Sequence, residues 1–172
     1  MRKQFLRLAR VVAFAAATMC AVTTTASARD VVPFDNGYSA GTVVVVTHQR
    51  RLYYVLGHGQ ALSYPVGVGR AGKQWAGVSR IDGKYVRPAW SPPREIRRDK
   101  PSLPAVIPGG SPRNPMGVAA LTLEGGEYAI HGTNTPRSIG GYVSYGCIRM
   151  YNEDILDLYG RVRVGTQVVV VR

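Results

Sequence analysis

The side chains best suited to catalysis lie between His131 and Arg149. Cys147 is the only cysteine beyond position 28, and it directly follows Tyr145 and Gly146. A thiolate is a strong nucleophile, and a neighbouring imidazole can take the proton of the thiol. We therefore predict that Cys147 is a nucleophile and that His131 is its general base. The alternatives are a cysteine that packs as a small buried hydrophobe and a histidine that only ends a strand.

The backbone around the cysteine could stabilise a developing negative charge. Glycine permits sharp turns and close approach, so we predict that the N–H groups of Tyr145, Gly146 and Cys147 form an oxyanion hole. Such donors contribute roughly 3–4 kcal/mol each in acyl-transfer enzymes. Ser144 would either hydrogen-bond this loop or polarise the site.

Arg149 is the nearest cation to the cysteine in sequence. A guanidinium can bind a carboxylate through two parallel hydrogen bonds, which predicts a substrate anchor. The alternative is an ordinary salt bridge to Glu153 or Asp154. The residues alone do not decide between the two.

No metal or nucleotide cofactor is expected. One cysteine and the dispersed His48, His58 and His131 lack the spacing of a zinc site. The letters Gly67-x-Gly69-x-x-Gly72 match a dinucleotide fingerprint, but no βαβ unit follows them.

Residues 1–28 have the pattern of a secretory signal peptide. Four basic residues precede an apolar run at positions 11–22, and Ala26-Ser27-Ala28 is a small-residue cleavage site. The apolar run is shorter than the ~20 residues that span a bilayer, which disfavours a retained membrane anchor. Lipidation of Cys20 is disfavoured because Met19 precedes it. The sequence therefore predicts an exported protein, without stable membrane insertion after cleavage.

Removal of these residues lowers the formal net charge from +12 to +8. The positive charges are scattered along the chain, and no nucleic-acid-binding motif is present. A solvated basic surface is therefore favoured over a nucleic-acid partner.

The remaining chain reads as mainly β, with an irregular leader over residues 29–40 and one domain over residues 41–172. Alternation and β-branched runs predict these strands: Thr42–His48, Arg51–Leu56, Ala61–Val68, Ala119–Leu123, Tyr128–His131 and Gln167–Arg172. A short hairpin is expected over Val78–Val86, with its turn at Asp82-Gly83. The rest of the Pro- and Gly-rich segment 69–115 is expected to form a lid or wall.

One helix is expected shortly after the cysteine. Asn152 fits its N-cap and Gly160 its C-terminal cap. Ile155, Leu158 and Tyr159 recur at helical spacing and should face the sheet.

The motifs resemble the catalytic domain of the bacterial L,D-transpeptidases. They are H-G-T-N, S-x-G-C-I-R-M-x-N-x-D, a Leu-Tyr helix and V-G-T-x-V, supported upstream by P-A-W-S-P-P and I-P-G-G-S-P-R-N-P-M-G. The resemblance covers nearly all of residues 41–172. It implies a mainly β fold, a β-sandwich or partly open barrel, with the cysteine in a cleft under a Pro/Gly-rich lid.

The resemblance also implies an exported enzyme of the periplasm or cell envelope that remodels peptidoglycan and so affects cell shape. Cys147 would attack the diamino-acid–D-alanine bond of a stem tetrapeptide, form a thioester and pass the acyl group to an amine. The amine would belong to a second stem or to an envelope protein. Cofactors are not expected, and carbapenems should acylate the cysteine. The alternatives are a hydrolase with the same fold and a non-enzymatic wall-binding module.

Residue roles carried over from the resemblance are more specific. The backbone carbonyl of Gly132 would orient the base, and Ser144, Tyr145, Asn134 and Arg149 would contact substrate. Many members have a histidine where this chain has Tyr145, so acceptor choice or thiol reactivity could differ. Trp75-Ala76-Gly77 also stands where Thr-Pro-x-Gly is common.

Overall fold

The structure, a computed structural model, describes residues 29–172 and is mainly β, as expected. The predicted signal peptide lies outside the described residues. The strands are β1 (Asp30–Pro33), β2 (Val43–Val46), β3 (Arg51–Gly57), β4 (Gln60–Pro65), β5 (Val68–Gly69), β6 (Gly77–Val86), β7 (Ala119–Leu123), β8 (Ala129–His131), β9 (Tyr142–Ser144), β10 (Ile148–Arg149) and β11 (Gln167–Val171). The helices are α1 (Arg94–Asp99), the 3₁₀ helix η1 (Pro136–Ser138) and α2 (Asn152–Arg161). No helix within residues 29–172 is long and apolar enough to cross a membrane.

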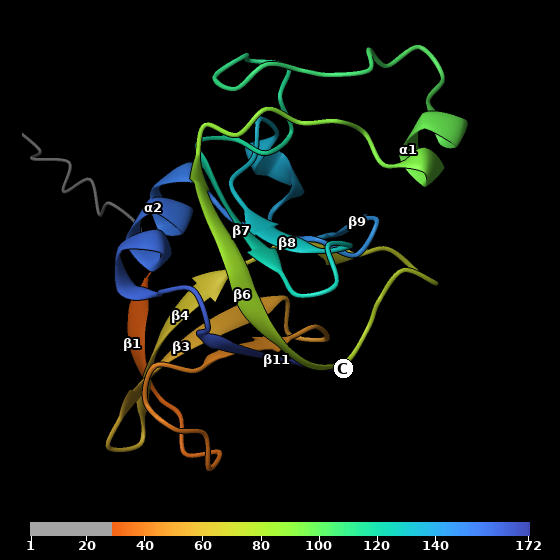
Figure 1. Cartoon of the computed structure of the whole chain (residues 1–172). Helices are drawn as coiled ribbons and strands as arrows, with labels where there is room; N and C mark the ends of the chain where they lie inside the picture. Colours follow the sequence, from red (N-terminus) through yellow and green to blue (C-terminus); the bar gives the residue numbers. More distant parts are fainter. Residues whose placement is uncertain (1–28) are drawn as a thin grey trace, which may run out of the picture.

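Nine strands form one sheet in the order β1-β4-β3-β2-β11-β6-β7-β8-β10. β1 and β10 are its edges, so the sheet is not closed into a barrel. The long strand β6 joins the two halves, because residues 77–80 pair with β11 and residues 81–86 pair with β7 (Figure 1). A separate pair is formed by β5 and β9, which run parallel.

Two expectations about strands are wrong. Asp82-Gly83 is not a hairpin turn, because β6 continues through it with a shift of register against β7. The Asp82 carboxylate accepts a hydrogen bond from the Thr122 hydroxyl on β7, which ties the irregular position to the sheet. The leader is not irregular throughout, because residues 30–33 form β1 and pair antiparallel with β4.

Helix α2 packs on the sheet through the side chains predicted for it. Ile155 and Leu158 are fully buried, and Tyr159 packs at the edge of the same core. This core also contains Leu121 of β7 and Ile130 of β8. The helix therefore covers the strands that lead into the predicted site.

The predicted helix caps are wrong in detail. Asn152 is the first residue of α2, and its side-chain oxygen accepts the backbone N–H of Thr133 at 3.0 Å. Gly160 lies inside the last turn, and the helix ends at Arg161. Asn152 thus links the start of α2 to the loop that follows His131.

The segment 87–118 leaves the sheet after β6 and returns to it at β7. Figure 1 shows it as a long excursion above the sheet that carries α1. Trp90 and Ile107 pair backbone to backbone within it. Val106 is half exposed, whereas Ile107 is buried. The lid or wall expected here therefore has a short helix that its Pro- and Gly-rich sequence did not suggest.

Candidate active site

The parallel pairing of β8 with β10 brings the predicted site residues together. Ile148 lies opposite Ile130, and Arg149 lies opposite His131. Side chains alternate between the faces of a strand. Arg149 and His131 therefore share one face, and Cys147, two residues before Arg149, projects to the same side.

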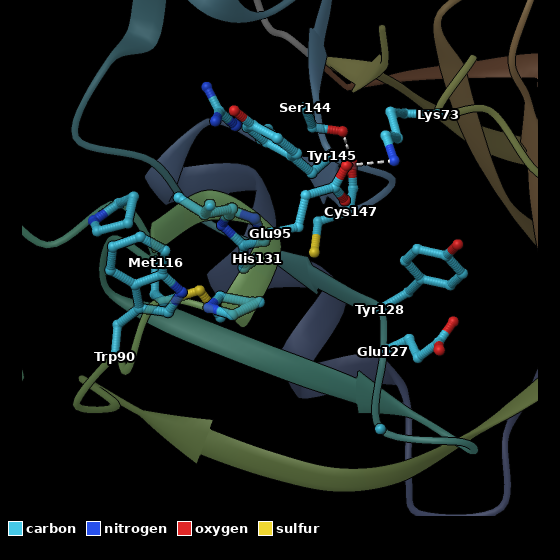
Figure 2. Close-up of a pocket in the computed structure, with 15 residues that line it drawn as sticks. Lys73, Trp90, Glu95, Met116, Glu127, Tyr128, His131, Ser144, Tyr145 and Cys147 are labelled. Atoms are coloured by element: carbon cyan, nitrogen blue, oxygen red, sulfur yellow. Dashed lines mark hydrogen bonds and ion pairs between the residues drawn. The ribbon is translucent and has the colours of Figure 1, made fainter. Parts of the chain in front are cut away.

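These side chains line a cavity of about 490 Å³. Figure 2 shows the sulfur of Cys147 and the ring of His131 inside it, with Tyr128, Met116 and Trp90 around them. The complete lining is Lys73, Trp90, Pro93, Glu95, Ile96, Pro115, Met116, Gly126, Glu127, Tyr128, His131, Ser144, Tyr145, Cys147 and Arg149. The structure thus brings the one described thiol and the histidine to the wall of the same cavity.

His131 is buried and oriented by backbone carbonyls. Its Nδ1 lies 2.6 Å from the carbonyl oxygen of Gly132, the contact that the resemblance implied. A carbonyl only accepts, so Nδ1 carries the hydrogen and the neutral ring has its lone pair on Nε2. Burial, followed by the charge of Arg149, lowers the pKa of His131 to about 4, against the opposing contacts with the Gly132 and Pro115 carbonyls. The imidazole is therefore neutral at pH 7 and able to accept a proton.

The Cys147 thiol is also neutral at rest. Burial raises its pKa above the ordinary value, and a hydrogen bond from the Ala129 backbone and the charge of Arg149 offset part of that rise. The Ala129 contact was not foreseen, although it follows from the register that places Ala129 beside Cys147. The site is thus a neutral thiol beside a neutral imidazole rather than a preformed ion pair.

Ser144 fixes the conformation of the cysteine loop, residues 144–147, through two hydrogen bonds. Its hydroxyl donates to the carbonyl of Cys147 at 2.6 Å and accepts the N–H of Gly146 at 3.0 Å. The N–H of Gly146 is therefore already used, which corrects its assignment to the oxyanion hole. The Ser144 hydroxyl is likewise occupied within the loop, although the residue lines the cavity.

Gly146 is required by its surroundings. Its φ is +124°, a region that other residues rarely adopt, and a Cβ here would collide with the ring of Tyr128. Its carbonyl accepts a hydrogen bond from Trp75 Nε1 at 3.0 Å, and Trp75 stacks on Tyr128 at 5.0 Å between ring centroids. Trp75 and Tyr128 thus support the loop, and the sequence had not singled out either residue for that role.

Arg149 faces the cavity without an acidic partner among residues 29–172. It forms no ion pair with Glu153 or Asp154, and its Nε is buried with no hydrogen-bond partner. Asp154 instead lies 3.7 Å from the guanidinium of Arg29. The salt-bridge alternative for Arg149 is therefore wrong. A half-buried cation with a buried, unused donor favours an anionic ligand.

Of the other two residues predicted to contact substrate, Tyr145 lies at the cavity and Asn134 does not. Tyr145 lines the cavity, and its ring lies under the guanidinium of Arg70. Asn134 is exposed and does not line the cavity, because its amide donates to the carbonyl of Pro112 at 3.2 Å. Asn134 thus links its own loop to the loop at Pro112, and its contact with substrate stays a prediction.

Helix α1 supplies a wall of the cavity that the sequence did not reveal. Glu95 and Ile96 of α1 line it, and the carboxylate of Glu95 lies 2.5 Å from Lys73 Nζ (Figure 2). The interrupted charges of segment 94–100 were the available signal, but they carry no information about their partners. Within residues 29–172, no group of three or more His, Cys, Asp or Glu side chains could hold a metal ion.

Comparison of the sequence with known proteins identifies the family. The family model of the YkuD L,D-transpeptidase catalytic domain matches residues 40–170. The probable L,D-transpeptidase ErfK/SrfK of Salmonella typhimurium is 41% identical over 139 residues, which cover 76% of this chain and 44% of that protein. The probable L,D-transpeptidase YbiS of Escherichia coli is 41% identical over 136 residues, with 74% and 43% covered. This chain thus spans less than half the length of these curated relatives.

Solved structures share the fold at lower identity. An L,D-transpeptidase from Mycobacterium smegmatis superposes with a TM-score of 0.61 at 17% identity, covering 76% of this chain and 58% of that one. The catalytic domain of the Enterococcus faecium L,D-transpeptidase superposes with a TM-score of 0.59 at 19% identity, covering 78% and 100%. These likenesses concern the fold alone.

Proposed function

Because the chain belongs to the YkuD family of L,D-transpeptidase catalytic domains, we propose that it is an exported cysteine acyltransferase acting on peptidoglycan stem peptides in the periplasm or cell envelope. The observation that carries the proposal is the cavity that Cys147 and His131 both line, with His131 Nδ1 held 2.6 Å from the Gly132 carbonyl. That contact leaves Nε2 as the proton acceptor for a thiol in the same space. Nucleophile and base are both side chains, so the reaction as written needs no cofactor.

The donor step begins from neutral groups. Cys147 Sγ attacks the carbonyl of the diamino-acid residue while the thiol proton passes to His131 Nε2. The tetrahedral oxyanion accepts hydrogen bonds from the N–H groups of Tyr145 and Cys147, since that of Gly146 is occupied. Collapse breaks the bond to D-alanine, which leaves as the amine with the proton from His131, and a thioester remains on Cys147.

The acceptor step reverses the proton transfers. An amine of a second stem, or of an envelope protein, attacks the thioester carbonyl while His131 takes its proton. The C–S bond breaks, the sulfur recovers that proton, and a new amide is released. Arg149 is the proposed anchor for a carboxylate of the stem peptide, because its Nε is buried and unsatisfied among the described residues.

A covalent probe tests the nucleophile. Exposure to a carbapenem, followed by intact-protein mass spectrometry, should give one adduct on the wild type and none on Cys147→Ala. Cys20→Ser is the matched control, which changes the other cysteine of the full chain and should keep the adduct. A wild type that forms no adduct, or an adduct that persists in Cys147→Ala, would refute the assignment.

Analysis of muropeptides tests the fate of the acyl group. A strain without the protein would be complemented with the wild type or with Cys147→Ala, and its peptidoglycan fragments compared. New crosslinks, or a peptide remnant attached to stems, mean transfer to an amine, whereas trimmed stems mean transfer to water. Complementation by Cys147→Ala equal to wild type would instead indicate a non-enzymatic wall-binding role.

A further inference from the structure

Helix α1 has no anchor in the hydrophobic core. It is six residues long, and none of its side chains is buried. Even so, Glu95 and Ile96 form part of the cavity wall beside the thiol. Contacts other than core packing must therefore fix the position of α1.

Those contacts are polar and cross the mouth of the cavity. Tyr145 Oη donates to Asp99 Oδ2 at 2.8 Å, and Arg70 Nη2 lies 3.1 Å from the same oxygen. The Arg70 guanidinium also lies 3.9 Å from the centre of the Tyr145 ring. Lys73 adds an ion pair with Glu95 at 2.5 Å. The cysteine loop and the loop after β5 thus both contact the C-terminal end of α1 at Asp99, and the loop after β5 also contacts its N-terminal end at Glu95.

The base of the same segment is held in a different way. Asn114 is buried, and its amide donates to the carbonyls of Pro88, Ile107 and Pro108 at 2.9, 3.3 and 3.1 Å. The backbone bridge between Trp90 and Ile107 lies next to it. Buried hydrogen bonds are costly to break, whereas exposed ionic contacts are weak and screened by salt. Motion of the segment is therefore expected at α1 and not at its base.

We propose that Tyr145 is a positioning residue that, through Asp99, holds α1 over Cys147 and so sets the access of the donor peptide to the thiol. Tyr145 lies two residues before Cys147, so a shift of α1 would change the position of the cysteine loop through the Tyr145–Asp99 hydrogen bond. The hydrogen bond from Tyr145 is also the main reason that the pKa of Asp99 falls below its usual value, with Arg70 second. The identity of the donor rests on the proposed function, but the access to the thiol does not.

Alkylation of Cys147 by iodoacetamide tests the proposal without any substrate. Peptide mass spectrometry follows Cys147 separately from Cys20 in the full chain. Tyr145→Phe, which keeps the ring, and Asp99→Asn should each speed alkylation about threefold to tenfold, in line with the weakness of one exposed polar contact. The double variant should be no faster than Asp99→Asn alone, because Asp99→Asn already weakens the contact that Tyr145→Phe removes, together with the ion pair to Arg70.

Arg98→Gln is the matched control on the same helix. Among residues 29–172, the ion pairs of Arg98 are with Glu95 and Asp99 of α1 itself, at 3.7 and 3.4 Å, and none is with the cysteine loop. Its alkylation rate should stay within about twofold of the wild type. Additive effects in the double variant, single variants at the wild-type rate, or a control as fast as the single variants would each overturn the proposal.

Salt and turnover give two further readouts. Raising the salt concentration should speed alkylation of the wild type and have less effect on Asp99→Asn, because screening weakens the contact that this variant already lacks. With a stem tetrapeptide as donor, Asp99→Asn should raise KM with kcat within about twofold, as expected when binding is lost and the chemistry is kept. Absence of turnover in every variant would count against the proposed function alone, and the alkylation rates would still decide the role of Tyr145.

Discussion

The buried carboxylate of Asp154 makes an unusual prediction about stability and pH. Asp154 lies in the first turn of α2 with no exposed surface, and neither of its oxygens accepts a hydrogen bond from the residues that the structure describes. Burial, aided by Glu153 and Asp157 and opposed by Arg29, raises its pKa from 3.8 to about 6. A pKa difference of about 2 corresponds to about 3 kcal/mol. The ionised form of Asp154 therefore destabilises the fold above pH 6.

The sign follows from the protons bound in each state. Between about pH 4 and pH 6 the folded protein keeps the Asp154 proton and the unfolded chain has lost it, so the free energy of unfolding falls as pH rises. His131 acts in the opposite direction, because its folded pKa of about 4 lies below its usual 6.5 and the unfolded chain binds its proton. The two contributions are similar in size and nearly cancel in the wild type.

Asp154→Asn should uncover the His131 contribution. Its free energy of unfolding should equal that of the wild type near pH 4 and exceed it by about 3 kcal/mol at pH 7.5. Urea denaturation between pH 4 and pH 7.5 measures this difference. In the folded protein Asp157 titrates below this range, because its contact with Arg161 lowers its pKa to about 2. Glu124→Gln, an exposed acid in the loop between β7 and β8 that does not contribute to the raised pKa of Asp154, is the control and should show no such trend. A constant difference between Asp154→Asn and the wild type at all pH values would refute the reasoning.

Three further predictions concern the cysteine loop. Ser144→Ala removes both of its hydrogen bonds and should lower the free energy of unfolding by about 2 kcal/mol; an unchanged melting temperature would contradict this. Gly146→Ala forces a Cβ into the ring of Tyr128 at a positive φ, and should cost more than about 3 kcal/mol, again read by denaturation; full stability would contradict the stated backbone geometry. Arg149→Gln removes a charge that lowers the pKa of His131, so the titration of the imidazole followed by NMR, near pH 4 in the wild type, should move to higher pH; a titration that stays in place would contradict the coupling.

The site could be predicted largely because its chemistry is concentrated in one short stretch. Strand-forming residues end at His131, and glycine precedes the only cysteine of the predicted mature chain, so both features are local. The pairing of Arg149 with His131 was not readable in the same way, because register depends on contacts across the sheet. The helix after the cysteine was expected from its apolar spacing, but its start was misjudged because Asn152 bonds to Thr133 rather than capping.

The parts that could not be predicted depend on partners far apart in sequence. Asp82-Gly83 is equally compatible with a turn and with a bulge, and only pairing with β7 decides for the bulge. The position of α1 depends on Arg70 and Tyr145, which lie on either side of it in the chain. A run of mixed charges shows that ion pairs are possible and not which ones form. A lid or wall was therefore expected from the sequence, but helix α1 and its contacts with Arg70 and Tyr145 were not.

If Cys147 and His131 act as proposed, the burial that keeps both groups neutral would link substrate binding to the strength of the base. The charge of Arg149 lowers the pKa of His131, and it also opposes the rise in the pKa of Cys147. A stem-peptide carboxylate bound to Arg149 would cancel part of that charge, so the imidazole would become a better base when the donor is in place. The thiol would become a weaker acid at the same moment, which favours transfer of its proton during attack on the carbonyl over prior ionisation. A resting thiol of this kind reacts slowly with adventitious electrophiles, because the thiolate is the reactive form. If the protein is exported as proposed, the neutral pair would limit oxidation of the thiol until a stem peptide binds.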